Sequence, residues 1–260
     1  VLWGNNVWMA AGKDGDMWRS TDGSTWAEVD MSGVTGWSTS ADVRHLASDG
    51  AGNWICGNDT GLFRSTNDGA GWTRVFITSD SPVSDNTYEV RGVCHATYGG
   101  TARWVVLVRK SGNTRVIYSN AVTSLSWTLA TVDGSAASGQ DIVAHSNRHI
   151  AAGAGTVIMA VGNDFSRSTN GGQDWTYTTD SDGLPRTDAR GLATDGNGNW
   201  VVVHDNGRVS INTEDGAPGE WNEQSGNNAT SGDLTRLAFP TGGTNVENLD
   251  AIAANVLLPL

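Results

Sequence analysis

The sequence predicts an all-β protein, a β-propeller of about five four-stranded blades that is closed by joining its N- and C-terminal strands. Three observations support this prediction. Short β-like runs alternate with turn residues and show no helical period. A unit of roughly 48 residues recurs along the chain of 260 residues. The composition includes 34 glycines but only five prolines, which indicates many tight turns rather than disorder.

The clearest landmark of the unit is a tryptophan that follows a turn rich in Ser, Thr, Asn, Asp and Gly. This turn and its tryptophan occupy residues 20–26, 65–72 and 168–175, and looser copies cover 119–127 and 212–221. The tryptophans are separated by 46, 55, 48 and 46 residues, and they are Trp26, Trp72, Trp127, Trp175 and Trp221.

Two more landmarks precede each turn. One is a β-like run that contains, in successive units, Trp8, Trp54, Trp104, Val157 and Trp200. The other is a short segment that begins with arginine, at 44–47, 91–94, 148–151 and 190–193. Each unit therefore has four predicted strands: an inner strand at the arginine segment, a Trp- or Val-rich strand, a strand ending in the Ser-Thr turn, and a strand starting at the turn tryptophan.

The first unit lacks an arginine segment before Trp8, so we expect the C-terminal part of the chain to supply its inner strand. Residues 234–238 and 249–253 are equally suitable, and either would close the ring. We accordingly assign residues 1–240 to the propeller and 241–260 to a C-terminal strand or tail. If 234–238 closes the ring, the apolar end 256–260 would suit a partner surface or would pack on the propeller's own rim.

The turn copies resemble the Asp-box, or BNR repeat, whose pattern is Ser-x-Asp-x-Gly-x-x-Trp. The second and fourth copies have its length with Asn in place of Asp, the first is one residue short, the third has lost Asp and Gly, and the fifth is expanded. The resemblance implies a propeller such as those of sialidases, sortilin-type receptors, a photosystem assembly factor and many phage virion proteins. In these families the boxes lie away from the ligand.

Box residues are expected to be structural. A short Asp or Asn side chain accepts hydrogen bonds from its own turn, Gly tolerates positive φ, and Trp covers the turn. The structural set comprises Ser20, Asp22, Gly23, Trp26, Ser65, Asn67, Gly69, Trp72, Ser168, Asn170, Gly172, Trp175, Trp127 and Trp221.

Composition excludes several classes of function. A formal net charge of −12 argues against binding nucleic acid or an acidic membrane surface. No apolar run approaches the roughly 18 residues of a membrane span. Cys56 and Cys94 have neither metal nor redox spacing and are expected to be buried free thiols. Residues 195–199 look like the start of a calcium loop but lack its later glycine and distal glutamate, so we expect a hairpin turn, no metal and no cofactor.

The sharpest enzymatic alternative is a sialidase-like glycoside hydrolase. That resemblance would imply three arginines that bind a substrate carboxylate, together with a Tyr/Glu nucleophile pair. Arginine candidates exist, but they recur at one position of the repeat, which favours a structural role; they are Arg44, Arg91, Arg148 and Arg190. The Arg-Ile-Pro segment typical of sialidases is missing, and five blades are fewer than their six. We therefore predict no catalytic residues.

A ligand would bind on the face opposite the boxes. In a propeller the loops that enter the inner strands and those that join the second and third strands share this face, and here the entering loops break the repeat. Trp37 and Tyr88 are their aromatic residues, each with hydroxyls and carboxylates nearby, which suits a sugar ring. The four repeated arginines would surround the channel mouth on the same face, as ligand contacts or as partners of loop carboxylates.

We therefore predict a non-catalytic recognition or structural propeller. The Gly/Asn/Thr/Ser-rich style looks most like virion appendage or receptor-binding subunits, which contact a cell-surface glycan or a protein and can form oligomers. A secreted or periplasmic binding or assembly propeller is the second hypothesis, and the glycoside hydrolase is the third. The expected location is accordingly the virion, the periplasm or the extracellular space.

Overall fold

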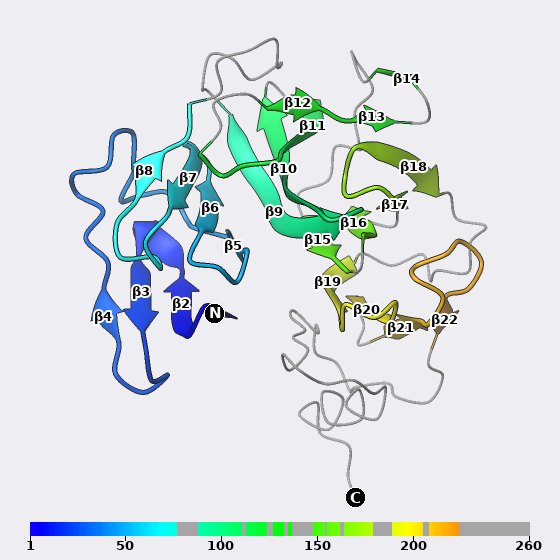
Figure 1. The fold of residues 1–260 in the computed structure, drawn as a ribbon, viewed down its shortest axis with the longest axis horizontal. Helices are drawn as coiled ribbons and strands as arrows, with labels where there is room; N and C mark the ends of the chain where they lie inside the picture. Colours follow the sequence, from blue (N-terminus) through cyan, green and yellow to red (C-terminus); the bar gives the residue numbers. More distant parts are fainter. Residues whose placement is uncertain are drawn as a thin grey trace, which may run out of the picture. The chain divides into compact units, whose positions relative to one another are not determined.

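The protein is built from β-strands in five antiparallel sheets, with one short 3-10 turn, η1 (Lys13–Gly15) (Figure 1). The computed structural model describes residues 1–76, 88–110, 113–123, 127–132, 135–136, 148–153, 155–161, 164–178, 189–204 and 208–223. Two compact units are present. The first contains the first three sheets apart from residues 96–99, together with residues 131, 135 and 136, and the second contains the other described residues of the last two sheets.

The first unit holds twelve strands of the repeat. The first sheet is β1 (Leu2–Gly4), β2 (Val7–Ala11), β3 (Met17–Ser20) and β4 (Ala27–Glu28). The second sheet is β5 (His45–Ser48), β6 (Trp54–Asn58), β7 (Gly61–Ser65) and β8 (Thr73–Arg74). The third sheet is β9 (Glu89–Tyr98), β10 (Thr101–Lys110), β11 (Asn113–Ser119) and β12 (Thr128–Leu129). The next two strands in the chain, β13 (Thr131–Val132) and β14 (Ser135–Ala136), belong to the fourth sheet, which has six strands.

The second unit repeats the pattern. Its sheets contain β15 (Arg148–Ala152), β16 (Val157–Val161), β17 (Asp164–Ser168) and β18 (Asp174–Thr178), then β19 (Ala189–Thr194), β20 (Trp200–His204), β21 (Val209–Asn212) and β22 (Asn222–Glu223). Every four-strand set starts with its inner strand and pairs each strand with the next one. These five sets are the blades of a β-propeller, as the repeat predicts.

The first blade differs from the prediction, because it has an inner strand of its own. β1 pairs with β2 through Leu2 opposite Met9 and Gly4 opposite Val7. The expectation that the chain end must supply this strand is therefore wrong. Asn5 and Asn6 both have positive φ, of 47° and 60°, and form a two-residue hairpin turn that makes three residues enough for pairing. Residues 234–238, 249–253 and the whole segment 241–260 lie outside the described residues.

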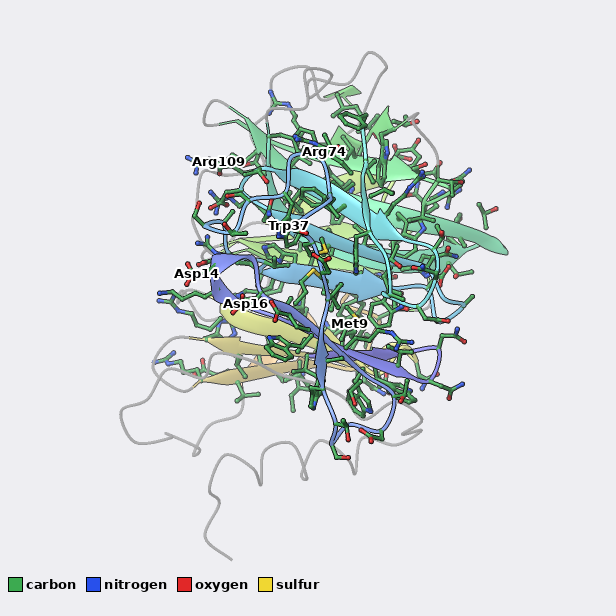
Figure 2. All side chains as sticks on the ribbon, turned by 90° about the vertical axis from the view of Figure 1, so that its left-hand side faces the viewer. Met9, Asp14, Asp16, Trp37, Arg74 and Arg109 are labelled. Atoms are coloured by element: carbon green, nitrogen blue, oxygen red, sulfur yellow. The ribbon has the colours of Figure 1, made fainter. Side chains whose placement is uncertain are left out.

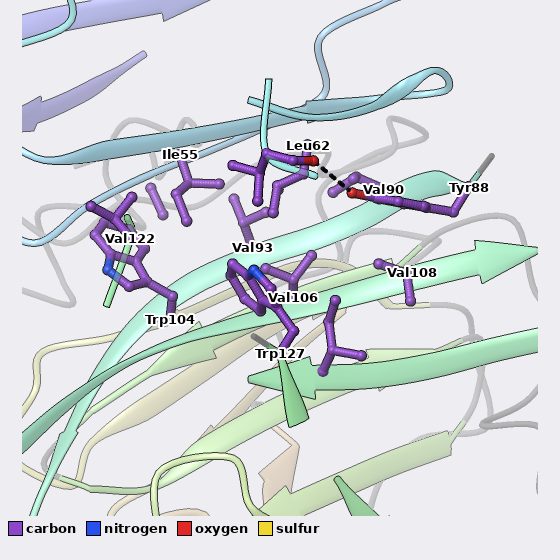
Figure 3. Close-up of a cluster of buried hydrophobic side chains, with 13 residues drawn as sticks. Ile55, Leu62, Tyr88, Val90, Val93, Trp104, Val106, Val108, Val122 and Trp127 are labelled. Carbon is purple, nitrogen blue, oxygen red and sulfur yellow. Dashed lines mark hydrogen bonds between the residues drawn. The ribbon is translucent and has the colours of Figure 1, made fainter. Parts of the chain in front are cut away.

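Buried clusters hold neighbouring blades together within each unit. In the first unit, Met9 (Figure 2) packs with Trp54 and Phe63 of the second blade. Alternate residues of β6 point the other way, so Ile55 packs with Trp104 and other residues of the third blade (Figure 3). In the second unit, residues of both blades share one cluster, which contains Ile158, Phe165, Ala189, Trp200, Val202 and Trp221.

Both thiols lie in these sheets. Cys56 and Cys94 are buried and free, as predicted. Burial in apolar surroundings raises the pKa of each thiol well above its ordinary value.

The box turns are held by their own side chains. Ser65 Oγ accepts the amide of Gly69 at 3.0 Å and donates to Asn67 Oδ1 at 2.8 Å, while Trp72 Nε1 donates to Gly69 O at 3.0 Å. The same bonds recur in the first and fourth copies, in the sets Ser20, Asp22, Gly23, Trp26 and Ser168, Asn170, Gly172, Trp175. In the fifth copy Asn212 Oδ1 takes the place of the serine oxygen and accepts the amide of Gly216 at 2.8 Å. Trp127 and Trp221 are 3% and 6% exposed.

An arginine before the box ties one blade to the box of the next. Arg19 Nε donates to Asp68 O at 2.8 Å, and Arg167 Nε donates to Asp215 O at 3.0 Å. Both acceptor residues have positive φ, 58° for Asp68 and 53° for Asp215, which turns their carbonyl groups toward the preceding blade. In the described residues the box face is thus occupied by structural hydrogen bonds. A binding site is therefore expected among the loops on the opposite face.

Candidate functional site

On the opposite face of the first unit, the loop that enters the second blade meets the turn between β2 and β3. Val43 N donates to Gly12 O at 2.8 Å, and Asp14 N approaches Asp42 Oδ1 at 3.4 Å. Arg44 pairs with Asp42 at 3.2 Å. The loop that enters the second blade and the turn between the second and third strands of the first blade therefore lie together, as the propeller prediction requires.

Trp37 of this entering loop packs into the second blade. Its side chain is half-buried, and its ring centroid lies 4.7 Å from that of Phe63 in an edge-on arrangement of 76° (Figure 2). Thr60 Oγ1 donates to Gly36 O at 3.2 Å beside it. Part of the ring is thus used for packing on its neighbour.

Arg74 is fixed beside the same loop. Its Nη2 donates to Thr60 O at 2.8 Å, and its guanidinium carbon lies 5.7 Å from the ring centroid of Phe76. A methyl group at Gly36 would overlap this guanidinium, so glycine at that position leaves room for the arginine. Phe76 is 42% exposed and is one of the few large apolar side chains at the surface of the described residues.

Tyr88, the second aromatic residue predicted to line a ligand site, is a core residue. It is 3% exposed, packs in the cluster between the second and third blades, and donates its hydroxyl to Val75 O at 3.4 Å (Figure 3). Burial raises the pKa of its hydroxyl. In this position Tyr88 anchors the start of β9 and offers no face to a ligand.

Four charged side chains of alternating sign form a chain of ion pairs at the start of β9, and we name them the charged rim: Asp59, Glu89, Arg91 and Arg109. Arg91 Nη1 lies 3.8 Å from Asp59 Oδ1, and its Nη2 donates to Glu89 Oε2. Arg109 Nη1 lies 3.6 Å from the same Glu89 oxygen. The Arg91 side chain is 13% exposed, whereas the other three are 35–41% exposed. The rim thus combines one buried cation with three charges that solvent or a partner can reach.

The predicted arginines do not form one cluster in the described contacts. Arg91 belongs to the charged rim, while Arg44 pairs locally with Asp42. Arg190 is half-buried on β19, and Arg148 begins β15 with a side chain outside the described residues. The ion pairs of Arg44 with Asp42 and of Arg91 with Asp59 match the alternative in which these arginines bind loop carboxylates, and Arg91 pairs in addition with Glu89 of β9.

Sequence reasoning did not single out Arg74 and Phe76, although one signal was available. Arg74 lies two residues after its box tryptophan, where the other copies have Glu28, Leu129, Tyr177 and Glu223. A basic residue there departs from the repeat, and such departures mark candidate functional positions.

Three aspartates, Asp30, Asp42 and Asp195, accept local hydrogen bonds that lower the pKa of their carboxyl groups. A hydrogen bond from Arg44 lowers the pKa of Asp42, and the Ser32 hydroxyl and amide lower that of Asp30. Burial raises the pKa of Asp195, but hydrogen bonds led by that of the Asn199 side chain outweigh it and lower the pKa overall.

The predicted hairpin at residues 195–199 is present. Asp195 Oδ1 accepts the amides of Asn197 and Asn199, at 2.7 and 3.2 Å, within its own turn. In the described part of the chain, no group of His, Cys, Asp and Glu side chains could hold a metal ion. Nor do the described residues include a helix long and apolar enough to cross a membrane.

Comparison with known proteins identifies the fold. No protein-family model matches the sequence, and no curated protein is similar to it in sequence. Among solved structures the chain is similar to YCF48 bound to D1 peptide, with a TM-score of 0.58 and 11% identity over 85% of this chain and 64% of that one. It is also similar to an ancestral GH74 enzyme, with a TM-score of 0.58 and 17% identity over 86% of this chain and 30% of that one.

YCF48 from Cyanidioschyzon merolae gives a TM-score of 0.53 and 15% identity over 80% of this chain and 63% of that one. The chain thus spans less than two thirds of each of these structures. At such identities the likeness concerns architecture alone, and these neighbours differ in what their names describe. The chain is an all-β five-bladed β-propeller, structurally similar to YCF48 and to GH74 propellers.

Proposed function

We propose that this protein is a non-catalytic recognition propeller that binds a protein partner, in the form of an extended peptide segment, through its charged rim. The observation that carries the proposal is the row of alternating charges formed by Asp59, Arg91, Glu89 and Arg109. Half-exposed charges of both signs give little stability to a fold, but they give register and specificity to an interface.

The residues beside the rim support a peptide rather than a sugar. Sugar recognition would use a flat, open aromatic face, whereas Trp37 is half-buried beside Phe63 and Tyr88 is 3% exposed. The exposed aromatic ring is instead Phe76, which is stacked with the guanidinium of Arg74. A single apolar anchor beside a polar row suits an extended peptide. YCF48, which has the same architecture, is described in complex with the D1 peptide.

The ion pairing of the rim carboxyl groups supports recognition rather than glycoside hydrolysis. That reaction uses one carboxyl group as the acid that protonates the leaving group, placed about 5–10 Å from a second carboxylate. Asp59 and Glu89 are instead each engaged in an ion pair with an arginine. This favours recognition over the hydrolase alternative, even though a GH74 enzyme has a similar fold.

The virion, extracellular or periplasmic location stays a prediction from the Gly/Asn/Thr/Ser-rich composition.

A cell-surface glycan is the alternative ligand. A glycan array run in parallel with a peptide screen distinguishes a glycan ligand from a peptide ligand.

A random peptide display library on the immobilised chain tests the proposal. We expect enriched peptides that bind the wild type and lose binding to Arg109→Glu. Arg208→Glu is the matched control, because Arg208 is also a half-exposed arginine paired with a glutamate, at 3.2 Å from Glu223. Hydrolysis of glycosides, glycan binding without peptide binding, or equal peptide binding by both variants would contradict the proposal.

A further inference from the structure

Glu89 is an unusual member of the charged rim, because a single oxygen serves two guanidinium groups. Arg91 Nη2 and Arg109 Nη1 both approach Glu89 Oε2. Contact is therefore through one Nη atom of each arginine, whereas a guanidinium binds a carboxylate best through two parallel N–H donors. The present pairing uses only part of what the two arginines can donate.

Both arginines retain an unused donor. Among the described residues, Arg91 Nε and Arg109 Nε are buried and have no hydrogen-bond partner. A buried donor without a partner is costly, and such exceptions in a folded protein call for an explanation. A carboxylate that used the Nε and Nη donors of a guanidinium together would remove this cost.

The local charge also favours an anion. The rim contains two guanidinium groups and two carboxylates, and Arg74, which donates to the carbonyl of Thr60 next to Asp59, adds a third guanidinium group in a protein whose formal net charge is −12. A surplus positive charge in an acidic protein attracts a negatively charged group to one place and repels it elsewhere. Glu89 is 37% exposed, and an ion pair at such exposure contributes little, so it can be exchanged.

We propose that the charged rim binds a carboxylate of its partner between Arg91 and Arg109, in the place that Glu89 occupies in this structure. Glu89 is then an internal substitute that is displaced on binding, and the partner is an acidic peptide. This inference rests on the proposed function, since it names the chemistry of the same site.

Hexaglutamate is a suitable probe, with hexaglutamine and hexalysine as controls at constant ionic strength. The readout is the NMR signal of each arginine Nε–H group, assigned with Arg91→Lys and Arg109→Lys. We expect hexaglutamate to shift the signals of Arg91 and Arg109 and to leave those of Arg208 and Arg167 unchanged. General repulsion by the acidic surface makes a local shift diagnostic.

Glu89→Gln provides the decisive variant. It removes the competing charge and keeps the size of the side chain, so hexaglutamate should bind about threefold to tenfold more tightly than to the wild type. Signal dispersion in the same spectra reports whether the variant is folded. Shifts distributed over all arginines, or the absence of a shift in both the wild type and Glu89→Gln, would overturn the inference.

The two proposals can fail separately. If library peptides bind the rim but are not acidic and hexaglutamate gives no shift, the carboxylate inference is wrong and the proposed function stands. If no peptide binds at all, the proposed function is wrong.

Discussion

The contact between the second and third blades predicts a large effect of a single methyl group. Gly57 lies on β6, and a Cβ atom there would overlap both Cβ and Cγ1 of Val90 on β9. A side chain can rotate its γ carbons away, but Cβ moves only with the backbone. Gly57→Ala must therefore push β6 and β9 apart.

The magnitude follows from the type of clash. Overpacking a well-packed core typically costs about 1–3 kcal/mol, and we expect about 3 kcal/mol because backbone must move. Gly57 has no positive φ, so no conformational penalty is included. Gly50→Ala is the complementary control: its φ is 72° with no atom within 4 Å of the added carbon, so only the left-handed backbone costs, at about 1 kcal/mol.

Urea unfolding of the two variants measures the difference. Val90→Ala removes the γ carbons but leaves Cβ, so it should restore only part of the stability of Gly57→Ala. Because Glu89 and Arg91 flank Val90, Gly57→Ala should also weaken the contact between Asp59 and Arg91. If Gly57→Ala is no less stable than Gly50→Ala, the packing of these two blades is not as described.

Three further predictions concern other parts of the molecule. Gly216→Ala should cost about 2–4 kcal/mol in urea unfolding, because the added carbon meets a buried isoleucine of the preceding blade. Gly219→Ala has a similar φ but open space around the added carbon, so it should cost about 1 kcal/mol. Equal losses of stability in the two variants would contradict the box packing. The lowered pKa of Asp195 contributes stability that should be fully present above the ordinary pKa of 3.8 and should be lost as the pH falls through the lower pKa of the folded protein. The difference in unfolding free energy between the wild type and Asp195→Asn should therefore shrink in acid, and a difference independent of pH would refute this. Cys56 and Cys94 should resist a thiol reagent in the native protein and react in urea, since burial raises the pKa of both thiols; fast native labelling would show that they are accessible.

Strand order could be read from the sequence because the repeat carries it. The Trp- or Val-rich runs lie on strands in all five blades, and each box tryptophan either directly precedes the fourth strand of its blade or, at Trp175, lies on it. The strand β1 was missed because only three residues form it, and its signal is the Asn5-Asn6 turn rather than any periodicity. Short strands in tight hairpins fall below the length at which a pattern can be recognised.

The site was predicted only in part, for a physical reason. The loop face and Arg91 followed from the repeat, whereas the burial of Tyr88 depends on its contact with Val75, which directly follows β8 of the neighbouring blade. The sequence pattern does not predict which way a side chain points at a junction between loop and strand. The pairing of Glu89 with Arg109 likewise depends on the register between β9 and β10. The repeated sequence segments do not specify this register.

The central claim is that the charged rim is where a partner binds. Hydrogen exchange of the chain with and without an enriched library peptide tests it most directly. We expect slower amide exchange at residues 58–61, 73–76 and 89–91 on peptide binding, with the box turns at 65–72 unchanged. Protection confined to the box turns, with the rim unaffected, would contradict it.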